Sequence, residues 1–394
     1  MPRTERRGFL KGSAAGVLLL KPETVFGSQA NSALEVGIIG CGGRGNFIAG
    51  LFMEHTGSRI VALADPFRDR MEATVRNLKL TAVPRQYAGL NGYRELLASR
   101  PDAVAILSPP YFHPEQAEAA LSAGRHIYLA KPVAVDVPGC RSIAQTGEKA
   151  KGRVSFLVDW QSRVRPVFQE AVARVHNGAI GKLVFGQVYF HTGRLTPKSK
   201  PGMPAGEARL RDWVFDKVLS GDIIVEQAVH CLDAGNWYAR AHPLKARGTG
   251  GREARVDVGD CWDHFMAHYW YPGSLKVDFS CEQFAKGFGD YCIRMYGSKG
   301  VADSHHAGVV NILGENPWKG TGTEKDPTSL QGPVTNVKNF VESIRAGKLL
   351  NNIAPSVEST LTAILGRMAC YREDTVTWDE MMRSNEKLSA ALQI

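Results

Sequence analysis

The segment LEVGIIGCGGRGN, residues 34–46, decides how the first part of this chain folds. Residues 34–39 are a short apolar run, which predicts a buried strand, and a helix is expected to begin near Asn46. The six residues between them have the spacing G-x-G-x-x-G, which lets backbone N–H groups at a helix start face a pyrophosphate. The segment therefore predicts a dinucleotide site. Its expected cofactor-binding residues are Gly40, Cys41, Gly42, Gly43, Arg44 and Gly45.

Downstream of this segment, apolar runs continue to alternate with helical patterns. Further strands are predicted at residues 59–64, 103–107, 125–129 and 154–158. Strands that are apolar throughout and separated by helices indicate a parallel sheet with helices on both faces. We therefore expect an α/β, doubly wound Rossmann domain over residues 34–158.

The second predicted strand ends on an acidic residue, which bears on the choice of cofactor. Asp65 lies 25 residues after Gly40, where a carboxylate can accept hydrogen bonds from ribose hydroxyls and repel a 2′-phosphate. This favours NAD. Arg68 is close enough in sequence to contact the same part of the ligand, and it leaves NADP open.

The second part of the chain, residues 159–394, has a different pattern. Strands with shorter spacing are predicted at residues 183–191, 261–271, 274–281 and 291–296. Turns are expected at residues 271–274 and 297–300, and helices at 166–177 and 357–371. This pattern predicts an α+β domain with a large, mostly antiparallel sheet flanked by helices. An open sheet of this kind leads us to expect a homodimer or homotetramer formed through it.

Three polar residues are candidates for catalysis. Lys131 follows the fourth apolar strand, at the edge of the sheet where such folds bind ligands. Glu226 and His230 are four residues apart in a predicted helix over 222–233, so they share one helix face. A solvated surface pair and a metal site are the alternatives. Two ligands without a third nearby argue only weakly for a metal, and no metal is expected.

Taken together, these motifs resemble the Gfo/Idh/MocA oxidoreductase family. The resemblance rests on the glycine loop, the Asp-ended strand, Lys131-Pro132 and the helix with Glu226 and His230. It implies that Lys131, Glu226 and His230 surround the substrate carbon beside the nicotinamide. Two departures stand out: Ala130 replaces the family's usual Glu, and Glu226 replaces its Asp. The resemblance also assigns to the cofactor Ser108, Pro109 and His113, which follow the third strand, and Lys131.

The implied reaction is hydride transfer from a secondary alcohol, with a base removing the hydroxyl proton. Histidine suits a base near neutral pH, whereas lysine needs burial or a neighbouring cation to lower its pKa. We assign the role to His230 and Lys131 jointly, with Glu226 fixing the imidazole tautomer. A plain domain-junction role is the alternative for residues 159–163. The candidate substrate-binding residues are Trp160, Gln161, Arg163, His191, Arg211, Trp213, Glu226 and His230. His305 and His306 are read as loop residues.

The N-terminal residues 1–33 are read as an export signal and linker. Arg6 and Arg7 precede a short apolar run at 12–20, and small residues follow at 28–30. This resembles a twin-arginine signal, although Glu5 stands before the arginine pair where Ser or Thr is usual. We expect a periplasmic protein without a membrane anchor. The alternative is a cytoplasmic protein with a basic tail.

Composition excludes several other classes. The formal charge is +9, but residues 1–30 hold five Lys/Arg against two Asp/Glu, and the other basic residues are scattered. No nucleic-acid partner is therefore expected. The seven cysteines include no C-x-x-C pair, which argues against a disulfide framework and a zinc finger.

Export also affects the expected reaction, because free NAD is scarce outside the cytoplasm. We therefore expect a tightly bound cofactor that cycles between the oxidation of one sugar or cyclitol and the reduction of another. The first alternative is a redox-neutral glycoside cleavage, in which transient oxidation acidifies a neighbouring C–H. The second is a dinucleotide-binding sensor without catalysis.

Overall fold

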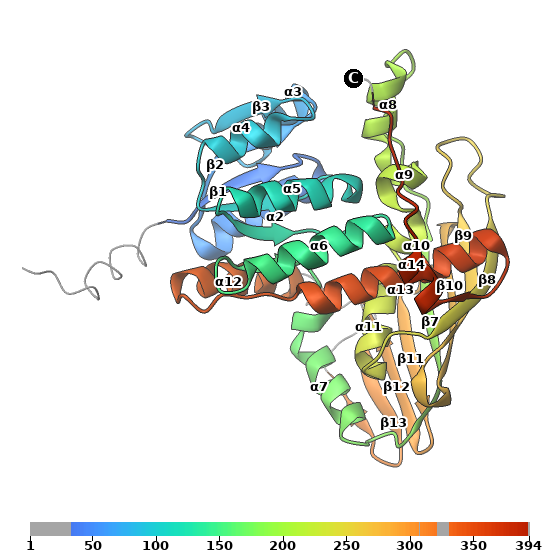
Figure 1. Ribbon diagram of the computed structural model, residues 1–394. Helices are drawn as coiled ribbons and strands as arrows, with labels where there is room; N and C mark the ends of the chain where they lie inside the picture. The colour runs from blue at the N-terminus through green and yellow to red at the C-terminus, as the bar shows by residue number, and fades with distance from the viewer. Residues whose placement is uncertain (1–32, 307, 321–330, 393–394) are drawn as a thin grey trace, which may run out of the picture. The chain divides into compact units, whose positions relative to one another are not determined.

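The computed structural model describes residues 33–306, 308–320 and 331–392. The predicted export signal, including Arg6 and Arg7, lies outside these ranges. From Leu34 onward the chain forms one compact unit built on two sheets (Figure 1). Among the described helices, none is both long and apolar enough to cross a bilayer.

The first sheet has six parallel strands in the order β3-β2-β1-β4-β5-β6. The strands are β1 (Glu35–Ile39), β2 (Arg59–Asp65), β3 (Arg85–Ala88), β4 (Ala103–Ile106), β5 (His126–Leu129) and β6 (Phe156–Val158). The helices between them are α2 (Gly43–Thr56), α3 (Arg68–Asn77), α4 (Gly92–Ala98), α5 (His113–Ser122) and α6 (Val137–Ala150). The predicted doubly wound sheet is confirmed. The strand that sequence reasoning missed is β3, a short polar edge strand without an apolar run.

Alternate residues of these strands enter two separate cores, one on each face of the sheet. One face packs with helices α4, α5 and α6, and the other packs with α2 and with α12 (Gln331–Arg345). Phe340 of α12 lies edge-on against Phe52 of α2 and Tyr128 of β5, with ring centroids 6.1 and 5.7 Å apart. A helix from the last quarter of the chain therefore completes the cover of the first sheet.

The second sheet has nine strands in the order β14-β13-β12-β11-β7-β10-β9-β8-β15. Its strands are β7 (Leu183–Gly193), β8 (Lys245–Gly251), β9 (His264–Trp270), β10 (Lys276–Ala285), β11 (Cys292–Gly297), β12 (Gly300–His305), β13 (Val310–Gly314), β14 (Trp318–Lys319) and β15 (Val376–Thr377). The helices of this part are α7 (Pro166–His176), α8 (Ala205–Arg211), α9 (Lys217–Ser220), α10 (Ile223–Glu226), α11 (Val229–Ala239), α13 (Ile353–Arg372) and α14 (Trp378–Arg383). Among the described strand pairs of this second sheet only β7–β10 is parallel, so the predicted mostly antiparallel sheet is confirmed.

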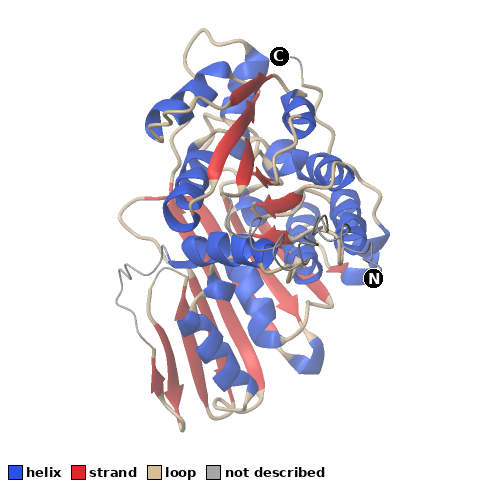
Figure 2. Cartoon of the chain, turned by 90° about the vertical axis from the view of Figure 1, so that its left-hand side faces the viewer, coloured by secondary structure: helices blue, strands red, loops and turns tan. Residues whose placement is uncertain are grey.

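Helices cover one face of this second sheet and leave the other open (Figures 1 and 2). Helices α7, α11 and α13 pack on the covered face. Burial alternates along β9, where Phe265, Ala267 and Tyr269 face the helices while Met266 and His268 are exposed. An antiparallel sheet with one solvated face has this alternation. The predicted turns at 271–274 and 297–300 connect β9 to β10 and β11 to β12.

Candidate active site

The glycine loop forms the expected turn between β1 and α2. Gly40 has φ 94°, and a Cβ there would lie 2.6 Å from the backbone of Leu107. A Cβ on Gly45 would lie 2.0 Å from the carbonyl oxygen of Gly40, so only glycine lets the helix approach the strand this closely. Helix α2 has Gly42 at its N-cap and no side-chain cap, which leaves its first N–H groups available to an anion.

A cavity extends from this loop along the carboxyl ends of β1, β2 and β4. Its lining residues include Gly40, Gly42, Gly43, Arg44, Asp65, Phe67, Arg70, Ser108, Pro109, Leu210 and Trp213. The cavity therefore contains most of the residues predicted for the cofactor. Arg68 is not among its lining residues and is exposed, whereas Arg70, one helical turn later than Phe67, lines the cavity.

Asp65 occupies the end of β2 as predicted, and its carboxylate also orders the loop. One oxygen accepts a hydrogen bond from the Cys41 N–H at 2.8 Å and the other from the Phe67 N–H at 2.9 Å. Asp65 is 3% exposed, and burial raises the pKa of its carboxyl group. Each carboxylate oxygen keeps a lone pair for a second donor. Asp65 can thus order the glycine loop and still accept a ligand hydroxyl.

Two other predicted cofactor residues, His113 and Cys41, do not present their side chains to the cavity. His113 is fully buried, with Nδ1 2.8 Å from the Pro132 carbonyl oxygen and Nε2 2.9 Å from the Ser108 carbonyl oxygen. It ties together the ends of β4 and β5 and does not line the cavity. Cys41 is 2% exposed, so it takes part through its backbone.

Lys131, Glu226 and His230 come together as predicted, but through a different local structure. The Lys131 ammonium lies 3.2 Å from a carboxylate oxygen of Glu226 and also donates to the Glu226 carbonyl. The predicted continuous helix is wrong: α10 ends at Glu226 and α11 begins at Val229. Among the described residues, no hydrogen bond joins Glu226 to His230. The carboxylate therefore positions the lysine and does not fix the imidazole tautomer.

The His230 ring has an environment that keeps it neutral. Burial lowers its pKa well below the usual value, and the nearby charges of Lys131 and Arg44 lower the pKa further. Arg44 also lines the cavity, so it connects the glycine loop to the candidate catalytic residues. An ion pair with Asp159 holds Arg44, and Asn336 of α12 donates to Asp159 at 2.7 Å. The ring is therefore uncharged near neutral pH, which leaves one ring nitrogen able to accept a hydrogen bond or a proton.

His306, which the sequence placed in a loop, is part of this cluster. Its ring centroid lies 4.8 Å from that of His230, and its Nδ1 lies 2.7 Å from the Ser162 hydroxyl. Burial lowers the pKa of His306 to about 4, and the charges of Arg165 and Lys131 lower it as well. His306 lies in the turn that follows β12, as predicted, whereas His305 belongs to β12, so its assignment to a loop was wrong. No local motif marks His306, because it reaches the site from the end of a distant strand.

Several predicted substrate residues are used for packing between parts of the fold. Trp160 is 2% exposed and donates from Nε1 to the Ser356 hydroxyl at 2.7 Å, so its ring offers no free face to a sugar. Arg163 makes a bidentate ion pair with Asp233 at 2.8–2.9 Å. Gln161 lies partly buried against the start of α12. For Trp160 and Arg163 the structure favours the domain-junction alternative.

The remaining predicted substrate residues lie at two other places. Arg211 and Trp213 belong to the segment that closes over the cofactor cavity, with Trp213 in its lining. Arg211 forms an ion pair with Asp69 of α3, at 2.8 and 3.0 Å, and lies 4.2 Å over the Phe67 ring. His191 lies on β7, with Nε2 2.8 Å from the Ser280 hydroxyl. We define the Arg211–Asp69 pair with the Phe67 ring as the clasp.

Comparison with known proteins settles the family. Residues 34–157 match the description "Oxidoreductase family, NAD-binding Rossmann fold", and residues 168–303 match the GFO/IDH/MocA C-terminal domain. The chain belongs to the Gfo/Idh/MocA family. This confirms the resemblance drawn from the glycine loop, Lys131, Glu226 and His230.

Individual curated relatives match only part of this chain, at moderate sequence identity. An inositol 2-dehydrogenase of Pseudomonas syringae is 32% identical over 151 residues, which are 38% of this chain and 44% of that protein. A glycosyl hydrolase family 109 protein of Saccharopolyspora erythraea is 27% identical over 190 residues, 46% of this chain and 40% of that protein. The chain thus spans less than half the length of these relatives.

Solved structures support the fold over nearly the whole described chain. The scyllo-inositol dehydrogenase of Lactobacillus casei, solved with bound NAD(H) and scyllo-inositol, aligns with a TM-score of 0.70. The alignment covers 88% of this chain and 100% of that one, at 19% sequence identity. At this identity the likeness shows a shared fold.

Proposed function

We propose that this protein is an oxidoreductase that transfers hydride between a nicotinamide cofactor and a hydroxyl or keto group of a sugar or cyclitol. One observation carries the proposal. The Lys131–Glu226 pair and the neutral His230 lie beside Arg44, which lines the cavity of the glycine loop. A proton acceptor and a hydrogen-bond donor therefore lie next to the cavity of the glycine loop. The relative named as an inositol 2-dehydrogenase supports the same substrate class.

The cavity residues fit NAD. The uncapped start of α2 suits a pyrophosphate, and the Asp65 carboxylate suits ribose hydroxyls. Arg70 in the lining gives a cationic neighbour, which leaves room for NADP. When bound, the nicotinamide cofactor supplies the hydride acceptor, and the residues of this chain supply orientation and proton transfer.

The side chains have distinct tasks in the proposed oxidation. His230 accepts the proton of the substrate hydroxyl, because its low pKa keeps it unprotonated near neutral pH. Lys131 donates a hydrogen bond to the same oxygen and polarises it, while Glu226 holds the ammonium group in place. His306 packs against His230, and its ring is uncharged at neutral pH because its pKa is lowered to about 4. Lys131 and His230 therefore act as one unit.

The test starts from the purified full chain, whose absorbance at the reduced-nicotinamide band is recorded before and after adding myo-inositol, glucose and glucosides. We expect reduction of bound cofactor by at least one of them. Lys131→Met should leave cofactor bound while turnover falls by two or more orders of magnitude. Lys149→Met, at an exposed position of α6, is the matched control and should match the unmutated protein. Bound cofactor without turnover on the whole panel would support the sensor alternative instead.

Glycoside cleavage without net oxidation is the second candidate. It is favoured by the two neutral imidazoles, since such a cycle needs a base for the hydroxyl and another for the acidified C–H. The relative named as a glycosyl hydrolase family 109 protein, 27% identical over 190 residues, supports this candidate. Release of an aglycone from a nitrophenyl glycoside, without net change at the nicotinamide band, would distinguish this candidate from the first.

The location of the protein and its oligomeric state are proposed from other features. We propose export through the twin-arginine route, which is supported by Arg6, Arg7 and the apolar run after them. A cofactor that stays bound to the protein would be the consequence of export. We also propose a homodimer or homotetramer through the open face of the second sheet, which exposes Phe185, Met266 and Leu313. Light scattering of the purified protein and of Met266→Lys tests this, and an unchanged monomer in both would refute it.

A further inference from the structure

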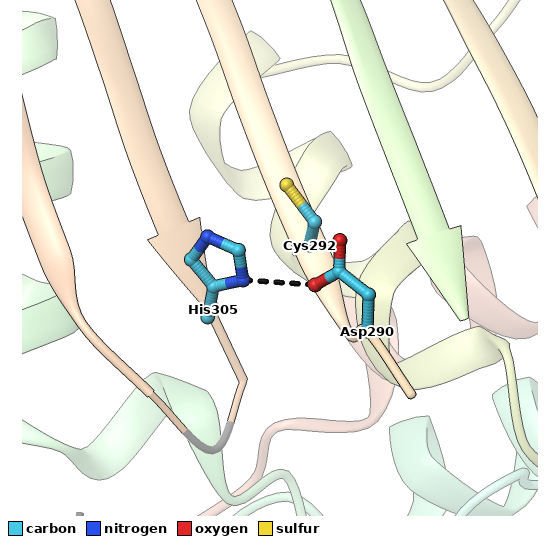
Figure 3. Close-up of side chains that lie close together, drawn as sticks. All are labelled: Asp290, Cys292 and His305. Atoms are coloured by element: carbon cyan, nitrogen blue, oxygen red, sulfur yellow. Dashed lines mark hydrogen bonds and ion pairs between the residues drawn. The ribbon is translucent and has the colours of Figure 1, made fainter. Parts of the chain in front are cut away.

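Three potential metal ligands meet on the open face of the second sheet (Figure 3). Cys292 of β11 lies directly opposite His305 of β12 in the antiparallel pair. Asp290 precedes Cys292 by two residues, so its side chain points to the same face. The pairing of β11 with β12 brings Cys292 and His305 together, although they are not close in sequence. We call Asp290, Cys292 and His305 the open-face triad.

The geometry of the triad suits a small metal ion. The ligand atoms, one each from thiol, imidazole and carboxylate, all lie within 4.8 Å of one another. His305 Nδ1 is 2.9 Å from an oxygen of Asp290. Ligands of a tetrahedral zinc ion, at about 2.0–2.3 Å from the metal, are roughly 3–4 Å apart, so small side-chain movements complete the site.

The surroundings of His305 give a second, independent indication. Its other ring nitrogen, Nε2, lies 3.4 Å from a carboxylate oxygen of Asp303, which accepts a hydrogen bond from Arg294 at 2.8 Å. Metal-binding histidines commonly direct their second nitrogen to a carboxylate, which orients the ring and strengthens the ligand. Cys292 is fully buried, and none of the described residues hydrogen-bonds to its sulfur. A metal would give this sulfur its partner.

We propose that Asp290, Cys292 and His305 bind one divalent transition-metal ion of the zinc class, with water in the fourth position. The thiolate and carboxylate neutralise the charge of the ion, and the mixed S, N and O ligands match zinc better than magnesium or calcium. His305 is adjacent in sequence to His306, which packs against His230. The ion would therefore fix the end of β12 that carries His306 to the active site.

Cobalt binding tests the proposal without relying on activity. The full chain is treated with a chelator and titrated with Co²⁺ alone, with absorbance read for the thiolate-to-cobalt band and for tetrahedral ligand-field bands. We expect both, at one ion per chain, and displacement by Zn²⁺. Absence of the thiolate band in the unmutated protein would overturn the proposal, whatever the variants do.

The variants then assign the ligands. Cys292→Ser should lose the thiolate band and weaken binding by 100-fold or more, and Asp303→Asn should weaken binding by about 10- to 100-fold through the orientation of His305. Cys140→Ser, at another buried cysteine on α6, is the matched control and should bind as the unmutated protein does. An unchanged thiolate band in Cys292→Ser, or its loss in Cys140→Ser, would place the metal elsewhere and refute the assignment.

Discussion

Replacing Arg211 by Met should accelerate cofactor release, because the clasp joins the two parts of the chain across the cofactor cavity. Arg211 pairs with Asp69 of α3 and covers the Phe67 ring, while Leu210 and Trp213 beside it line the cavity. We therefore expect release of a dinucleotide from that cavity to require movement of this segment. Arg211→Met keeps an unbranched apolar stem and removes both the charge and the planar guanidinium group.

The magnitude follows from the exposure of the groups. The Asp69 side chain is 62% exposed, so the ion pair contributes at most about 1 kcal/mol to the closed state. The contact with the Phe67 ring contributes about 0.5–1 kcal/mol. Together they amount to about 0.5–2 kcal/mol, which corresponds to an increase in dissociation rate of about 2- to 30-fold. Asp69→Asn removes the ion pair alone, and we expect a change of about fivefold or less.

Stopped-flow fluorescence of reduced cofactor leaving the full chain measures this rate. Arg209→Met is the matched control, because Arg209 pairs with Asp216 within the C-terminal part and does not bridge the cavity. The melting temperature should change little in any variant, since the ion pair is exposed. An equal effect of Arg209→Met, or an unchanged rate in Arg211→Met, would show that the clasp does not control release.

Other predictions concern cofactor choice, the histidines and Trp160. Asp65→Asn should weaken NAD binding by about tenfold relative to NADP in equilibrium titrations, because the charge that repels a 2′-phosphate is gone; unchanged selectivity would contradict this. The pKa values of His113 and His306 are lowered to about 4, so the unfolded chain binds more protons between about pH 6.5 and 4. The free energy of unfolding should therefore decrease as the pH is lowered from about 6.5 to 4, by up to about 1.4 kcal/mol per pH unit for each histidine. Urea denaturation of His306→Asn should show a smaller decrease over the same pH range. Trp160→Phe removes the hydrogen bond to Ser356 and should lower stability by about 1–2 kcal/mol, with substrate KM unchanged; a raised KM with unchanged stability would restore the substrate role.

The sequence predicted those parts of the site that are encoded locally. The glycine loop and Asp65 belong to one short strand–turn–helix–strand stretch, where spacing alone sets the geometry. Lys131 was predictable because the ends of neighbouring parallel strands lie at the same edge. Glu226 and His230 were correctly predicted to lie near Lys131, although the break between α10 and α11 that separates them was not predicted.

The parts that failed depend on contacts between distant segments. Tryptophan is a residue type that can stack on a sugar ring, which is why Trp160 was predicted to bind substrate. Only the packing of α13 onto Trp160 shows that its ring is buried. Trp213 belongs to the second half of the chain yet lines the cavity of the first half. His306 reaches the site from the end of β12, and no pattern around it in sequence signals that position. The positions of Trp160, Trp213 and His306 all depend on contacts between segments far apart in the chain. The spacing of residues in the sequence does not encode such contacts.

The position of α12 has a consequence for the order in which the chain acquires its structure during synthesis. Phe340 packs on Phe52 and Tyr128, so the part of this face that α2 does not cover stays uncovered until the ribosome has made nearly the whole polypeptide. The cavity beside the glycine loop is therefore completed late, because Leu210 and Trp213 line it and Asn336 of α12 holds Asp159, the partner of Arg44. A chain stalled near residue 158 would present an uncovered apolar surface to chaperones and proteases. Cofactor loading is thus expected to be a post-translational event.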